Sequence, residues 1–144
     1  MGHFFTHHTQ SKGFREIYGG VGLACLTIIL SWCVPESFQT EFFALLLAGI
    51  VGAYIGFMFS GTLTKRGIFV EVAVMFLFAF LLLAGVIRSV FWIVVGYFLH
   101  GVWDFVHHGV VRPKNFILVP EWYVFGCLIY DWVIGVYLIL HWWN

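Results

Sequence analysis

The feature that most constrains this fold is an apolar run of 41 residues, from Ile68 to His108, in which polar side chains are rare. As one α-helix, the run would be about 60 Å long, twice the thickness of the hydrocarbon core of a bilayer. It must therefore fold back on itself, and Arg88-Ser89 is the only polar break near its middle. The run predicts two membrane-spanning helices, one on each side of this break.

Three further apolar stretches are long enough to cross a membrane, because roughly 20 residues suffice. The five expected spans cover residues 17–34, 42–61, 68–87, 89–108 and 122–142. Only 10% of the residues are charged, whereas about 25% is typical of a soluble domain. The sequence thus predicts an all-α polytopic membrane helix bundle of five transmembrane helices. It forms a single integral membrane domain over residues 1–144, with a histidine-containing cytoplasmic tail at residues 1–16.

The basic residues predict the orientation of the bundle, because Lys and Arg are enriched in cytoplasmic loops. Six of the seven fall in the N-terminal tail and in the second and fourth loops, namely Lys12, Arg15, Lys65, Arg66, Arg112 and Lys114. Only Arg88 falls on the opposite side. We therefore expect the N-terminus inside and the C-terminus outside, in a cytoplasmic (inner) membrane. The seven basic residues are balanced by seven acidic ones, which argues against a nucleic-acid partner.

The second span carries a ridge of small residues at every fourth position, namely Ala48, Gly52, Gly56 and Ser60. Small residues let helices approach closely in a membrane, where apolar surface alone gives little driving force for association. We expect this ridge to pack against another helix of the same chain. The alternative is that it forms the contact face of a homodimer.

The fourth span ends in a cluster of polar side chains, in the sequence His100-Gly-Val-Trp-Asp104-Phe-Val-His107-His108. At about 100° per residue, the three imidazoles and the carboxylate share one helix face roughly 100° wide. An Asp at the centre of a membrane helix costs about 2.5–3.5 kcal/mol, so such residues usually serve a function. Nitrogen and carboxylate ligands together suit zinc or iron. The pattern predicts a metal site formed by His100, Asp104, His107 and His108, with His107 favoured over His108.

Two carboxylates on neighbouring spans are expected to face this cluster. Glu71 lies about one turn into the third span, and Asp131 lies near the middle of the fifth. We predict both as catalytic residues, acting as a further metal ligand or as a general base. The N-terminal tail adds three histidines on the same side of the membrane, whose contribution to the site stays open: His3, His7 and His8.

The spacing Asp104-x-x-His107-His108 resembles one histidine box of the membrane fatty-acid desaturases and hydroxylases. In that family such boxes hold two iron ions at the cytosolic face. Here the first position of the box is Asp instead of His, and two full boxes are missing. We therefore do not place the chain in that family.

Three functions fit the polar cluster. The first is a metal-dependent hydrolase or oxidase that acts on a lipid-type substrate, with membrane lipids as the surrounding partners. The second is a non-enzymatic small membrane subunit whose cluster stabilises the bundle or a larger complex. The third is proton- or ion-coupled transport along the buried ionisable groups. Haem is not expected, because bis-histidine ligation needs two helices at one depth and His141 lies on the far side.

Overall fold

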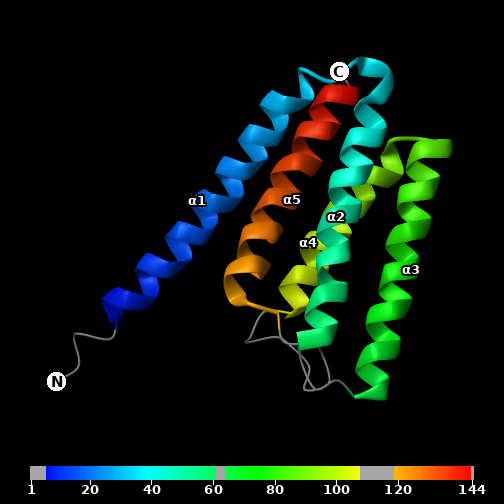
Figure 1. Cartoon of the computed structure of the whole chain (residues 1–144). Coiled ribbons are helices and arrows are strands. Elements are labelled where there is room, and N and C mark those ends of the chain that lie inside the picture. Colours follow the sequence, from blue (N-terminus) through cyan, green and yellow to red (C-terminus); the bar gives the residue numbers. More distant parts are fainter. Residues whose placement is uncertain (1–5, 61–63, 108–118, 144) are drawn as a thin grey trace.

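The computed structural model describes residues 6–60, 64–107 and 119–143 of the chain. These residues form five α-helices and one short 3-10 turn, shown in Figure 1. In chain order they are α1 (Thr6–Ser31), η1 (Glu36–Phe38), α2 (Gln39–Ser60), α3 (Lys65–Ile87), α4 (Phe91–His107) and α5 (Glu121–Trp142). The prediction of an all-helical bundle is confirmed.

The long apolar run folds back where its polar break predicts. Helix α3 ends at Ile87, α4 begins at Phe91, and Ser89 lies between them, with its hydroxyl accepting a hydrogen bond from the Phe91 amide at 3.3 Å. At the other end of α3, the Thr64 hydroxyl accepts a hydrogen bond from the Gly67 amide at 3.1 Å. Such N-cap bonds satisfy amides that have no partner within the helix.

Three segments in the described part of the chain are long and apolar enough to cross a membrane: Glu36–Phe59, Lys65–Ile87 and Glu121–Trp142. Helix α4 has 17 residues. Helix α1 begins at Thr6, so much of the expected N-terminal tail is helical and continues the first apolar stretch. The sequence around residue 16 contains neither Pro nor a run of turn-forming residues that would end a helix there.

Helix α5 lies between α1 and α4, and α3 packs against both α2 and α4 (Figure 1). Helices α2 and α4 end, and α3 and α5 begin, at the end of the bundle where α1 also begins (Figure 1). The link between α1 and α2 is at the other end, close to the end of α5. The arrangement brings the inward faces of α2, α3, α4 and α5 to a common interior.

That interior has an apolar part and a polar part. The apolar part contains side chains with 0% exposure from α2, α4 and α5, namely Phe43, Leu47, Ile93, Tyr97, Ile134 and Leu138. The polar part lies toward the end where α3 and α5 begin, and its ionisable members are Glu71, His100, Asp104, His107 and Asp131. All of these ionisable side chains are buried, so their partners must come from within the bundle.

Two glycines let α4 and α5 approach closely. A Cβ atom placed on Gly101 would lie 2.5 Å from the indole ring of Trp132, and one on Gly135 would lie 2.9 Å from the ring of Phe98. At each of these glycines, an aromatic ring of the neighbouring helix packs directly against the helix backbone. This packing places the polar face of α4 directly against α5.

The ridge of small residues on α2 does not pack against another described helix. Ala48 and Gly56 are exposed, and a Cβ atom on Gly52 or Gly56 would meet no described atom within 4 Å. The expectation of packing within the chain is therefore wrong for this ridge. The reason is that α2 uses a different face, which carries Phe43, Leu47 and Tyr54, to contact its neighbours. The homodimer alternative stays a prediction.

Candidate metal centre

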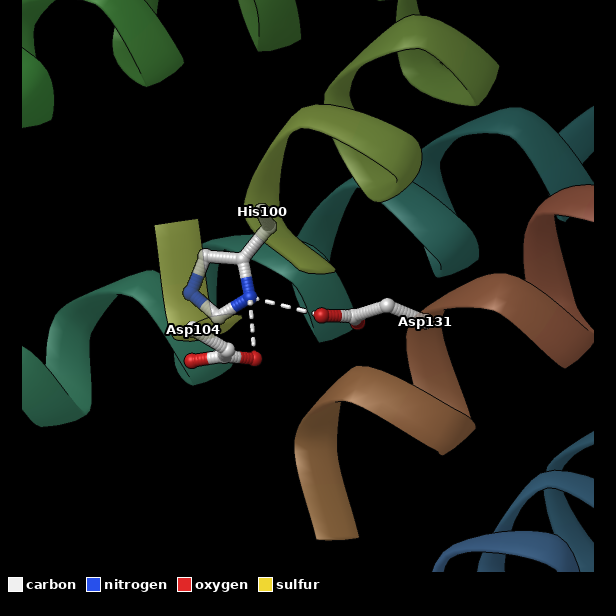
Figure 2. Close-up of side chains that lie close together, drawn as sticks. All are labelled: His100, Asp104 and Asp131. Carbon is white, nitrogen blue, oxygen red and sulfur yellow. Dashed lines mark hydrogen bonds and ion pairs between the residues drawn. The ribbon is translucent and has the colours of Figure 1, made fainter. Parts of the chain in front are cut away.

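His100, Asp104 and Asp131 form a compact buried group, shown in Figure 2. The imidazole Nδ1 of His100 lies 2.6 Å from Oδ2 of Asp131 and 3.4 Å from Oδ2 of Asp104. One ligand atom from each residue lies within 4.8 Å of the other two. His100 and Asp104 are one helical turn apart on α4, and Asp131 comes from the facing turn of α5.

Nδ1 of His100 and Oδ2 of Asp131 share a hydrogen bond. With Asp131 ionised, the carboxylate only accepts, and Nδ1 is then the donor. The second ring nitrogen, Nε2, points away from Asp131 (Figure 2). It has no hydrogen-bond partner among the described residues. A void of about 10 Å³ adjoins the His100 ring, with residues of α2, α3 and α4 around it, and a space of this size holds about one water molecule.

Tyr54 of α2 completes the surroundings of the group. Its hydroxyl donates a hydrogen bond of 2.5 Å to Oδ1 of Asp104. Its ring packs edge-on against the imidazole of His100, with 5.7 Å between the ring centroids. A donor behind a ligating carboxylate fixes its orientation and tunes its basicity. Tyr54 therefore acts as a positioning residue for Asp104.

The group carries more acceptors than donors. Within the described part of the chain, Oδ1 of Asp131 has no hydrogen-bond partner, and Oδ2 of Asp104 has only the 3.4 Å contact with His100. Two buried carboxylates share one imidazole, so the group would carry an excess of negative charge with both carboxylates ionised. Buried charge is costly unless it is paired or coordinates a metal. A divalent cation fits both the charge and the free oxygen atoms.

Glu71 and His107 form a second buried pair, further along the axis of α4 than the first group. Nε2 of His107 lies 2.9 Å from Oε1 of Glu71, and Nδ1 lies 2.9 Å from the carbonyl oxygen of Trp103. Both nitrogens of His107 are therefore engaged. His107 shares a helix face with His100 but lies about 10 Å further along the axis. The structure thus brings His100, Asp104 and Asp131 together and leaves His107 and Glu71 outside that group.

The remaining histidines are placed elsewhere or lie outside the described residues. His108 and His3 fall outside the described part of the chain, and His7 and His8 belong to α1 without described side chains. His141 lies at the other end of the bundle, where its Nε2 is 2.8 Å from Oε1 of Gln39. Its ring stacks on Tyr137, with centroids 5.4 Å apart.

Tyr54 is a neighbour of this group that the sequence-based prediction did not include. It lies in an apolar stretch of the second span, where a phenolic hydroxyl must find an acceptor when it is buried. That requirement was a usable signal, but nothing in the sequence showed that Asp104 would be the acceptor.

A family model matches residues 15–142, and its description is a family of unknown function, DUF6010. The matched range contains the whole His100–Asp104–Asp131 group, together with Tyr54, Glu71 and His107. No curated protein and no solved structure matches the chain.

Proposed function

The chain belongs to DUF6010, a family of unknown function, and we propose that it is an integral membrane protein that binds a metal ion at His100, Asp104 and Asp131. The proposal includes five membrane-spanning helices in the cytoplasmic (inner) membrane, with the N-terminus inside and the C-terminus outside. The observation that carries the proposal is the buried group itself, in which two carboxylates converge on one imidazole nitrogen within 4.8 Å.

The chemistry of the group supports zinc or iron. One imidazole and two carboxylates supply nitrogen and oxygen ligands, and their two negative charges balance one divalent cation. Binding at Nδ1 requires the proton that His100 shares with Asp131 to leave, so uptake of metal releases a proton.

A metal held by three protein ligands supplies Lewis-acid or redox chemistry at its open position. We propose a hydrolase or an oxidase acting on a lipid-type substrate, in which Asp131 serves as a ligand. Glu71 is engaged by His107, so it is proposed as a base only after that bond opens.

Metal analysis of protein purified without a histidine tag tests the proposal. We expect about one equivalent of zinc or iron per chain in the wild type, and loss of most of it in Asp104→Asn and in Asp131→Asn, because each removes a charged ligand. Glu71→Gln is the matched control, since Glu71 is another buried acid of the bundle but lies outside the group. It is expected to keep the metal.

Less than a tenth of an equivalent in the wild type, even before any chelator is added, contradicts the proposal. Equal metal loss in Glu71→Gln contradicts the assignment of the ligands. The alternative function is then favoured, in which the polar cluster stabilises the bundle as a small membrane subunit. The observation in favour of that alternative is the tight enclosure of the group, since the space beside His100 measures only about 10 Å³.

A further inference from the structure

A second feature of the molecule is a cavity of about 670 Å³ between α1 and α5, with Ile50 of α2 also at its wall. Cavities of about 300–1,000 Å³ are typical of small-molecule binding sites. The two helices touch at Gly20, where a Cβ atom would lie 2.5 Å from the carbonyl oxygen of Gly126. From there α1 leans away from α5 toward its N-terminal end (Figure 1). The cavity occupies this opening.

The walls of the cavity are largely apolar and are built from matching helix faces. On each helix, the lining residues are three or four positions apart and so share one helix face. They are Glu16, Gly19, Gly20 and Leu23 on α1, and Tyr123, Gly126, Cys127 and Tyr130 on α5. Glycine keeps the space open on both sides. A Cβ atom on Gly19 or on Gly126 would meet no described atom within 4 Å. Leu23 and Trp122 are exposed, so the cavity is accessible from the surface that faces lipid in the proposed topology.

The charged residues of the cavity lie at one end only. Arg15 and Glu16 are adjacent on α1 and line the cavity together with Trp122 and Tyr123 from the first turn of α5. Neither forms an ion pair with any side chain that the structure describes. An apolar chamber with one positive and one negative group at its entrance matches an amphiphile that has an apolar chain and a zwitterionic head group.

We propose that the cavity binds one chain of a membrane phospholipid whose head group carries a phosphate and an ammonium. The phosphate contacts the Arg15 guanidinium, and the ammonium contacts the Glu16 carboxylate. Arginine suits this role because its planar donors match phosphate oxygens. The proposal rests on the proposed membrane location but not on the metal ion. It assigns the lipid-type partner a binding site along the face of α5 that carries Cys127. Cys127 lies one helical turn before Asp131.

The test uses the full chain, reconstituted in vesicles of equal parts phosphatidylethanolamine and phosphatidylglycerol with identical acyl chains. The protein is extracted in mild detergent, and the retained lipid is counted by native mass spectrometry. We expect one phosphatidylethanolamine per chain in the wild type. Gly126→Leu is expected to lose most of it, because the new side chain projects into the cavity without meeting described protein atoms.

Gly22→Leu is the matched control, because Gly22 is an exposed glycine of α1 that does not line the cavity and whose Cβ would also meet nothing within 4 Å. It is expected to retain lipid as the wild type does. Glu16→Gln is expected to weaken the preference for phosphatidylethanolamine, because it removes the partner of the ammonium. Arg15→Gln is expected to lower the retention of both lipids, because both carry the phosphate. Circular dichroism and gel filtration check that each variant is folded.

Equal lipid retention in Gly126→Leu and the wild type overturns the proposed site. Equal retention of the two lipids by the wild type overturns the proposed head group. The metal content of the same samples separates the two proposals, since a protein that keeps its lipid but contains no metal contradicts only the metal site.

Discussion

At the scale of single residues, burial and hydrogen bonding decide the role of each ionisable side chain. His100 is 0% exposed and shares Nδ1 between two aspartates, whereas His107 is 1% exposed and has a partner at each nitrogen. Two histidines on one helix face thus differ in chemistry. His100 is a ligand of the proposed metal, whereas His107 connects α4 to Glu71 of α3.

Tyr54→Phe is expected to weaken metal binding by about 10–100-fold, the usual effect of removing a hydrogen bond behind a metal ligand. The phenyl ring keeps the edge-on packing against His100, so the fold is retained. Tyr97→Phe is the matched control, because it also removes a buried hydroxyl bond, but one to the backbone carbonyl of Phe43 at 2.9 Å instead of to a proposed ligand. Chelator competition measures the affinities. Equal weakening in both variants would argue against a specific role for Tyr54.

At the scale of helices, the contact between α4 and α5 is what assembles the site. Its two glycine–aromatic contacts, Gly101 with Trp132 and Gly135 with Phe98, bring the helices close enough for His100 to reach Asp131. Side-chain contacts between α1 and α5 are made by hydroxyl pairs such as Thr27 with Tyr130, at 3.2 Å. The α4–α5 pair therefore carries all three residues of the His100–Asp104–Asp131 group.

Gly101→Ala is expected to destabilise the protein by about 1–3 kcal/mol, the usual cost of overpacking. Its methyl group would lie 2.5 Å from the Trp132 ring and would push α4 and α5 apart. Gly22→Ala, on the exposed side of α1, is the control and is expected to be neutral or slightly stabilising, because Ala favours helix over Gly. Thermal unfolding in detergent measures both. The packing argument fails if Gly101→Ala is as stable as Gly22→Ala.

At the scale of the whole molecule, the bundle has two ends of different character. The end where α1, α3 and α5 begin carries Arg15, Lys65 and Arg66, and the polar group lies nearer to it. The opposite end carries the link between α1 and α2, the link between α3 and α4, and the end of α5. This distribution of basic residues is the basis of the proposed orientation.

The proposed orientation predicts that Cys33 is reachable from outside the cell. Cys33 is exposed in the link between α1 and α2. Cys25 is also exposed but lies within α1, on a surface that faces lipid in the proposed topology, and Cys127 is partly buried beside the cavity. A membrane-impermeant maleimide should therefore label the wild type in intact cells and should not label Cys33→Ser. Labelling of Cys33 only in inside-out vesicles would show the reverse orientation.

The sequence by itself determined the helical class, the position of the fold-back and the polar face of α4. These properties depend on local chemistry. Apolar runs form helices, the Arg88-Ser89 break ends one of them, and a spacing of four residues sets His100 and Asp104 on one face. The prediction that Asp131 and Glu71 face α4 was also correct, because an ionisable side chain inside a bundle has few alternatives to another polar partner.

Only the tertiary structure decided which of these polar residues pair with one another. Helix spacing placed His100, Asp104 and His107 on one face of α4, but depth along the axis paired His107 with Glu71 and left His100 and Asp104 for Asp131. The role of Tyr54, the outward ridge of α2 and the cavity beside α5 likewise depend on how the helices pack. Helix rotation and relative depth are set by contacts between distant segments, and a periodic pattern within one segment carries no information about them.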